Sequence, residues 1–258
     1  MLYSVPLCLC VAFVSKKVKD MLRSPTIARR ELASYFHSPI AYVAMTLFLL
    51  ACGFWFREDF QSGQPAEMRS IFNQMIFMQV LIIPLLCMGL MAQEWATGTI
   101  ESLMTAPVEE TDVVIGKFMG SFGFFLVLLV PTLLYVVMLR MYSQPDYGPI
   151  FSGYLGIVLV GAMFVSISLF CSSLTKSQIV AAVSASAILF VVTIVPWWAS
   201  SKATISGFWR AAVDQGVFAK YTDFTKGVID TGSLMYFVAI TTVFLFLTVK
   251  VLESRRWK

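Results

Sequence analysis

Six long apolar segments divide this chain and constrain its fold more than any other feature. They cover residues 40–56, 72–92, 118–139, 151–172, 179–198 and 234–251. A helix needs about 20 apolar residues to cross a bilayer, and a backbone in lipid must satisfy its own hydrogen bonds. The sequence therefore predicts an all-α integral membrane protein with six transmembrane helices. Its 58% hydrophobic and 13% charged residues exclude an ordinary soluble domain.

The basic residues predict the orientation of these helices. With the N-terminus inside, the inner segments hold more of the 19 Lys and Arg residues than the outer ones. Lys and Arg accumulate on the cytoplasmic side of membrane proteins. We therefore expect a multi-pass protein of a bacterial inner membrane with both termini in the cytoplasm. The net charge of +4 then reflects topology and does not indicate a nucleic-acid partner.

The first residues form a segment with its own pattern. An apolar stretch from Met1 to Val14 precedes Lys16, Lys17 and Lys19, which reverses the charge order of a secretory signal. The stretch is also too short to span a bilayer. Residues 1–24 are interpreted either as an interfacial anchor or, preferably, as an extension upstream of a working start at Met21. Residues 25–258 form one six-helix transmembrane domain.

A short amphipathic helix is predicted just before the first span. Ser24 and Pro25 suit its start, and Pro39 ends it. Its apolar face carries Ala28, Leu32, Tyr35 and Phe36, and its polar face carries Arg29, Arg30 and Ser34. Such a helix lies flat in the inner membrane interface. A plain extension of the first span is the alternative, and Pro39 argues against it.

The inner segment 93–117 predicts a second short helix between spans 2 and 3. Gly98 allows a bend, Thr99 can cap a helix, and Pro107 ends it. Ile100, Leu103 and Met104 would then share one face. An exposed apolar stripe on the cytoplasmic side requires a partner protein.

The outer segment 199–232 predicts an amphipathic helix before span 6. Ile205, Phe208, Trp209, Ala212 and Val213 follow helical spacing, but the segment is too polar to span. We expect a loop after it, through Tyr221, Asp223, Phe224, Gly227 and Asp230.

Catalytic and cofactor motifs are missing from the sequence. It holds one histidine, His37, and no Gly-x-x-x-x-Gly-Lys-Ser/Thr phosphate loop, so no cofactor is expected in this chain. The six apolar segments carry no charged residue away from their borders, which argues against a proton-coupled carrier. Asn73, Gln74 and Gln79 are interpreted either as pathway residues or as helix–helix hydrogen-bonding groups.

Several motifs together resemble the ABC exporter permeases of the second type, and among them the gliding-motility-type permeases. In the inner segment the matching residues are Glu94, Gly98, Thr99, Ile100, Glu101, Leu103, Thr105, Ala106, Pro107, Gly116 and Lys117. Further matches lie at 30–42, 153–156, 173–178 and 223–237. The similarity covers roughly residue 30 to the end of the chain. Trp95 and Ala96 depart from it, because relatives often carry basic residues there.

The resemblance implies a non-catalytic permease subunit that works with a separate ABC ATPase chain, which holds ATP and Mg. The predicted ATPase-coupling residues are Glu94, Gly98, Thr99, Ile100, Glu101, Leu103, Met104, Thr105 and Pro107. The predicted entry-helix residues are Arg29, Arg30, Glu31, Tyr35 and Phe36. Further implied partners are a second permease copy or related membrane subunit, an auxiliary extracytoplasmic protein and the lipid membrane.

Two other functions compete with this interpretation. The chain could be a membrane scaffold or channel without an ATPase, with a purely structural inner segment. A membrane-embedded enzyme is disfavoured because the core holds no charged residue and the chain no second histidine. Glu94 and Glu101 either fix the coupling segment as a lever or only solvate a surface turn. The substrate is not readable from the sequence.

Overall fold

The computed structural model describes residues 23–59, 68–99, 109–142, 146–200 and 216–256. Within these ranges the chain is helical and contains no strand. The helices are α2 (Arg23–His37), α3 (Pro39–Asp59), α4 (Arg69–Cys87), α5 (Gly89–Thr97), α7 (Glu110–Leu129), the 3-10 turn η1 (Val130–Thr132), α8 (Leu133–Tyr142), α9 (Tyr147–Leu174), α10 (Gln178–Ser200), α12 (Val217–Thr225) and α13 (Thr231–Arg256).

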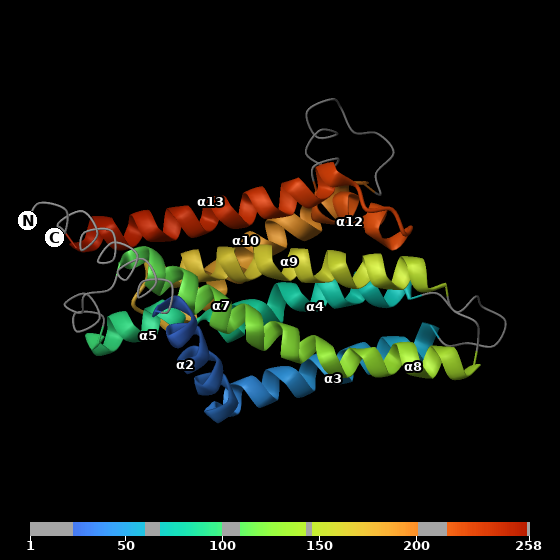
Figure 1. Cartoon of the computed structure of the whole chain (residues 1–258), viewed down its shortest axis with the longest axis horizontal. Helices are drawn as coiled ribbons and strands as arrows, with labels where there is room; N and C mark the ends of the chain where they lie inside the picture. Colours follow the sequence, from blue (N-terminus) through green and yellow to red (C-terminus); the bar gives the residue numbers. More distant parts are fainter. Residues whose placement is uncertain (1–22, 60–67, 100–108, 143–145, 201–215, 257–258) are drawn as a thin grey trace, which may run out of the picture.

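Six stretches of the described chain are long and apolar enough to cross a membrane, which confirms the six predicted spans. They are Pro39–Glu58, Arg69–Thr97, Glu110–Met141, Tyr147–Leu174, Gln178–Ala199 and Thr231–Ser254. The spans run along the long axis of the molecule (Figure 1). Helices α2 and α5 lie at the same end of the bundle as the last turns of α13, and α8 and α12 lie at the other end.

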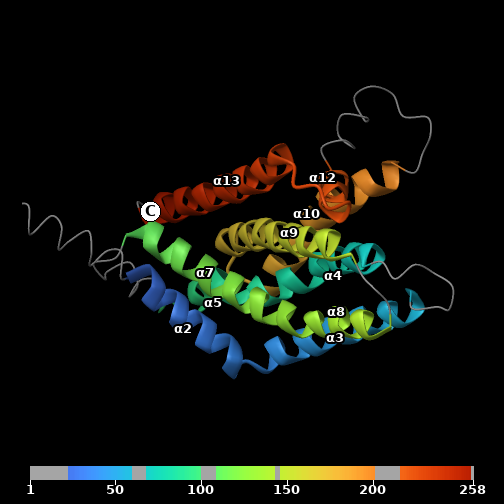
Figure 2. The same cartoon turned by 45° about the vertical axis from the view of Figure 1, so that its right-hand side comes forward.

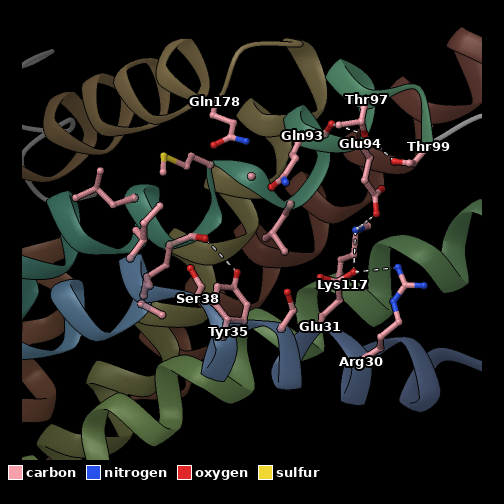
Figure 3. Close-up of a pocket in the computed structure, with 18 residues that line it drawn as sticks. Arg30, Glu31, Tyr35, Ser38, Gln93, Glu94, Thr97, Thr99, Lys117 and Gln178 are labelled. Atoms are coloured by element: carbon pink, nitrogen blue, oxygen red, sulfur yellow. Dashed lines mark hydrogen bonds and ion pairs between the residues drawn. The ribbon is translucent and has the colours of Figure 1, made fainter.

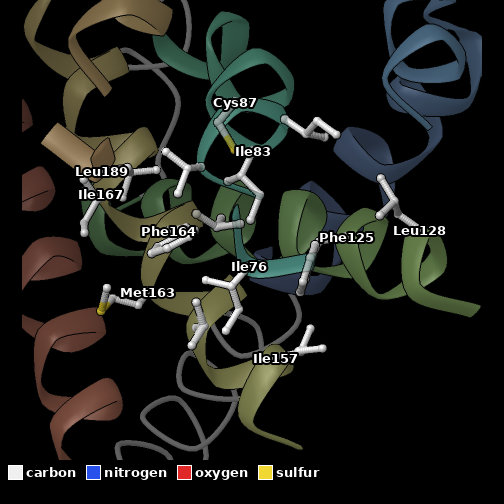
Figure 4. Close-up of a cluster of buried hydrophobic side chains, with 14 of the residues drawn as sticks. Ile76, Ile83, Cys87, Phe125, Leu128, Ile157, Met163, Phe164, Ile167 and Leu189 are labelled. Carbon is white, nitrogen blue, oxygen red and sulfur yellow. The ribbon is translucent and has the colours of Figure 1, made fainter. Parts of the chain in front are cut away.

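Helix α9 is the centre of the bundle. It contacts α4, α7, α10, α12 and α13, and 72% of its apolar window is buried, against 17% for α13. Three glycines let aromatic rings reach its backbone: Gly153 faces Phe72, Gly156 faces Tyr221 and Gly161 faces Phe125. Small residues at helix contacts permit this close approach in membrane proteins. Side chains of α4, α7, α9 and α10 complete the core around Phe164 (Figure 4).

The second span is interrupted at Met88, between α4 and α5. Such a break exposes backbone groups that must find partners inside the bundle. The Ser172 hydroxyl from α9 supplies them. It accepts hydrogen bonds from the N–H groups of Met91 and Ala92, both at 3.1 Å, and donates to the carbonyl of Met88 at 3.0 Å. The backbone groups at the interruption are therefore hydrogen-bonded, and the break lies about two and a half turns before the end of the span at Thr97.

Helix α12 corrects one prediction. The sequence predicted a loop through Tyr221, Asp223 and Phe224, but these residues lie in the helix Val217–Thr225. The Tyr221 hydroxyl donates to the Gly153 carbonyl at 3.2 Å, and Ser152 donates to the Phe224 carbonyl at 2.7 Å. The loop prediction was wrong because this helix is stabilised by contacts with α9 that local sequence does not reveal.

Two predicted helices lie largely or wholly outside the described residues. One is the outer amphipathic helix around 205–213, and the other is the coupling helix that was expected to follow Gly98. The N-terminal segment 1–22 also lies outside them.

Close packing on α9 generates a testable expectation. Gly161→Ala should lower the free energy of unfolding by about 1–3 kcal/mol, because the added methyl group overlaps the Phe125 ring. Gly148→Ala in the same helix is the matched control, since its new methyl group would make only ordinary contact with Asp146. Thermal unfolding of both variants in one detergent measures the difference. Equal melting temperatures would contradict the packing argument.

Candidate functional site

Helix α2 packs directly on the first half of α7 and runs beside it in both views (Figure 1, Figure 2). It ends at His37 and α3 begins at Pro39, so Pro39 separates the two helices as predicted. Gly120 on α7 allows the contact. A methyl group there would lie 2.6 Å from the Glu31 Cβ and 3.0 Å from the Ala28 carbonyl oxygen. The two helices thus meet almost backbone to backbone.

A buried ion cluster joins α2, α5 and α7 at this contact. The Lys117 ammonium on α7 lies 3.0 Å from Oε1 of Glu31 on α2 and 2.8 Å from Oε1 of Glu94 on α5 (Figure 3). The Lys117 side chain is 2% exposed, and the two carboxylates are 14% and 18% exposed. One cation therefore holds together three segments that are far apart in the sequence.

The burial of Lys117 makes both carboxylates necessary. A buried charge loses several kcal/mol of solvation and persists only with close counter-charges. Glu94 has further acceptor capacity, because its Oε2 is buried and has no hydrogen-bond partner among the described residues. Arg30 is an exposed member of the cluster, with its guanidinium 4.0 Å from Glu31 and its side chain 74% exposed. The cluster thus holds two carboxylates and an ammonium group inside and a guanidinium at its rim.

Tyr35 forms a second connection between α2 and the interrupted span. Its hydroxyl donates to the Leu86 carbonyl at 3.1 Å, beside the break at Met88. Its ring stacks on Phe124 of α7, with centroids 4.9 Å apart. Burial raises the pKa of the Tyr35 hydroxyl well above its usual value, and Cys87 and Glu31 add to the shift. The phenol therefore stays protonated and remains a donor at any physiological pH.

The predicted coupling segment starts where this cluster ends. Helix α5, which carries Glu94, ends at Thr97, and Gly98 follows in the left-handed conformation with φ 73°. Glycine adopts this conformation without steric cost. The remaining predicted coupling residues, Ile100, Glu101, Leu103, Met104, Thr105 and Pro107, lie outside the described part of the chain.

The other predicted site residues are more scattered. Arg29 and Phe36 are exposed on α2, and Phe36 packs edge-on against Phe124. On α4, Asn73 is exposed, Gln74 is half-buried, and Gln79 is 1% exposed, with an amide that has no partner in the described chain. Their role in a pathway stays a prediction. Within the described residues, no group of three or more His, Cys, Asp or Glu side chains could hold a metal ion.

Sequence reasoning missed the role of Lys117. The residue entered only as part of a motif and as one basic residue at the border of an apolar segment. A lone lysine directly before an apolar segment was a usable signal, because a cation inside a membrane helix requires acidic partners. Which of the acidic residues would supply them depended on how α2 and α5 pack on α7.

One comparison with known proteins gives a match to this sequence. Residues 12–208 match the family model described as ABC-2 family transporter protein. The matched region contains α2 to α10, and with them the entire ion cluster. No curated protein matches the chain.

The ion cluster predicts a strong and reversible effect on stability. Lys117→Met should destabilise the protein by about 3–5 kcal/mol, because two carboxylates would lose their shared buried counter-ion. Adding Glu31→Gln and Glu94→Gln to this variant should restore most of the loss, since no uncompensated charge remains. Thermal unfolding in detergent compares the three proteins. A triple variant as unstable as the single one would contradict the proposed role of charge.

The contact between α2 and α7 gives a separate prediction. Gly120→Ala should displace α2 and cost about 1–3 kcal/mol, because the new methyl group meets backbone atoms of α2. Gly123→Ala, one turn further along α7, is the control, since its methyl group would lie 3.7 Å from Leu32. Unfolding temperatures and cysteine-labelling rates on α2 report the change. The idea fails if both variants behave like the parent protein.

Proposed function

Because the chain belongs to the ABC-2 family of transporter proteins, we propose that it is the membrane-spanning permease subunit of an ATP-driven exporter. The ATPase is a separate chain that binds ATP and Mg. Two permease subunits stand side by side in the membrane, as two copies of this chain or as this chain with a related subunit. The bundle end that carries α2, α5 and the last turns of α13 faces the cytoplasm.

The observation that carries the proposal is the cluster around Lys117. It ties the interfacial helix α2 to the end of span 2 and the start of span 3, the two helices that flank the coupling segment. A push on that segment reaches α5 through Gly98 and α7 through Glu110. Because Lys117 holds both helices to α2, the three move as one body. This is the rigid coupling that an ATP-driven permease requires.

The motion then passes into the bundle through the interrupted second span. Tyr35 and Ser172 hold the two sides of the break at Met88. A change in the angle between α4 and α5 would transmit closure of the ATPase pair to the helices that surround α9. The transported substrate is either an amphipathic molecule or a peptide, or the work is mechanical and acts on an auxiliary partner protein.

A scaffold or channel without an ATPase remains the competing function. Affinity isolation of the chain from native bacterial inner membranes in mild detergent, followed by mass spectrometry, separates the two. A stoichiometric ATPase with a phosphate loop supports the exporter. A folded, monodisperse chain isolated without an ATPase would favour the scaffold or channel.

If the coupling segment acts as a rigid lever, mutations in it should uncouple ATP hydrolysis from transport. Gly98→Pro and Leu103→Asp should leave membrane insertion intact while ATP hydrolysis no longer drives transport. The first forbids the positive φ, and the second puts a charge on the apolar face that the sequence predicts for contact with the ATPase. Gly98→Asn is the control, since asparagine tolerates the left-handed conformation. The ratio of ATP hydrolysed to substrate moved in proteoliposomes is the measurement. An unchanged ratio in both variants contradicts the lever.

A further inference from the structure

A cavity of about 570 Å³ opens beside the ion cluster, between α2, the first residues of α3, α5 and the start of α10 (Figure 3). Its size lies within the roughly 300–1,000 Å³ range of ligand pockets. Ile40 and Leu86, which line it, belong to the first and second candidate spans. The cavity therefore lies between helix α2, which precedes the first span, and residues of the candidate spans themselves.

The lining of this cavity is polar at one end and apolar at the other. Ser34, Ser38, Gln93 and Gln178 line the polar part, and their side chains make no hydrogen bond to other described residues. They are available to an occupant. A site with both characters suits an amphiphile whose headgroup sits among the polar side chains.

The apolar end continues onto the outside of the bundle. Ile40 lines the cavity and is 49% exposed. Val43, Leu47 and Leu50 follow on the same face of α3 and are 66%, 49% and 73% exposed. An acyl chain leaving the cavity would find this apolar stripe along the first span.

The charges around the cavity are arranged in a definite order. Glu31 and Glu94 line it with Lys117 between them, and Oε2 of Glu94 has no hydrogen-bond partner among the described residues. Arg30 lies at the rim, 74% exposed and 4.0 Å from Glu31, so two carboxylates and two cations balance around the cavity. A bound group should therefore be positive at its inner end and negative at its outer end, with a net charge near zero.

We propose that this cavity binds the zwitterionic headgroup of a membrane phospholipid, with its amine toward Glu31 and Glu94 and its phosphate at Arg30. The two carboxylates at the inner end disfavour a purely anionic headgroup, and the guanidinium at the rim disfavours a simple cation. The stripe on α3 selects a lipid over a free zwitterion. The proposal stands on the cavity and its charges and does not require the partner ATPase.

Native mass spectrometry of the full-length chain, released from mild detergent, tests the site. The probes are dioleoyl phosphatidylethanolamine, dioleoyl phosphatidylglycerol and free phosphoethanolamine. The ethanolamine lipid should bind roughly tenfold more tightly than the glycerol lipid, as expected for one added charge-assisted contact. Free phosphoethanolamine should compete only weakly.

Two pairs of variants locate the binding. Arg30→Gln should weaken binding of the ethanolamine lipid roughly tenfold, whereas Arg29→Gln, which removes the same charge from an exposed neighbour outside the cavity, should not. Ser34→Leu should block the polar end, whereas Ala33→Leu on the adjacent exposed position should not. Circular dichroism verifies that all four variants are folded.

Three outcomes would overturn the proposal. The first is equal affinity for the two lipids. The second is loss of binding in Arg29→Gln and Ala33→Leu as well, which would indicate a general effect of the membrane surface. The third is competition by free phosphoethanolamine at lipid concentrations, which would assign the cavity to a soluble zwitterion.

Discussion

The arrangement of this protein at one membrane border depends on a single buried ammonium group. Lys117 is almost fully enclosed, and its charge is tolerated there because Glu31 and Glu94 approach it from two other segments. Breaking such a cluster costs far more than breaking a surface ion pair, because the remaining charges stay in a medium that solvates them poorly. The positions of α2, α5 and α7 are consequently linked, and none can shift alone without exposing or orphaning a charge.

The same requirement for satisfied polar groups shapes the centre of the bundle. The second span is broken at Met88, and the break is stable because Ser172 and Tyr35 reach its free backbone groups from α9 and α2. Around it, α9 brings its backbone close to aromatic rings of α4, α7 and α12 through glycines. Lipid provides no hydrophobic force between helices, so close packing and hydrogen bonding must supply their association.

If both proposals hold, this end of the bundle combines a mechanical role with a binding role. The cluster joins α2, α5 and α7, and the cavity next to it is lined by the charged groups of the same cluster. An occupant that interacts with Glu94 or Arg30 would contact the element that we propose transmits force. Bilayer composition could thereby influence the permease through the same side chains that join its helices.

The sequence by itself determined the six spans, the separation of α2 from α3 at Pro39 and the bend at Gly98, because these follow from apolar length, proline geometry and the freedom of glycine. The motif around Glu94 also indicated the family. The sequence did not reveal that Lys117 pairs with Glu31 and Glu94, that the second span breaks at Met88, or that residues 217–225 are helical. Each of these depends on partners distant in the chain. Only tertiary structure decides which charged and polar groups meet, since local sequence specifies the need for a partner but not its identity.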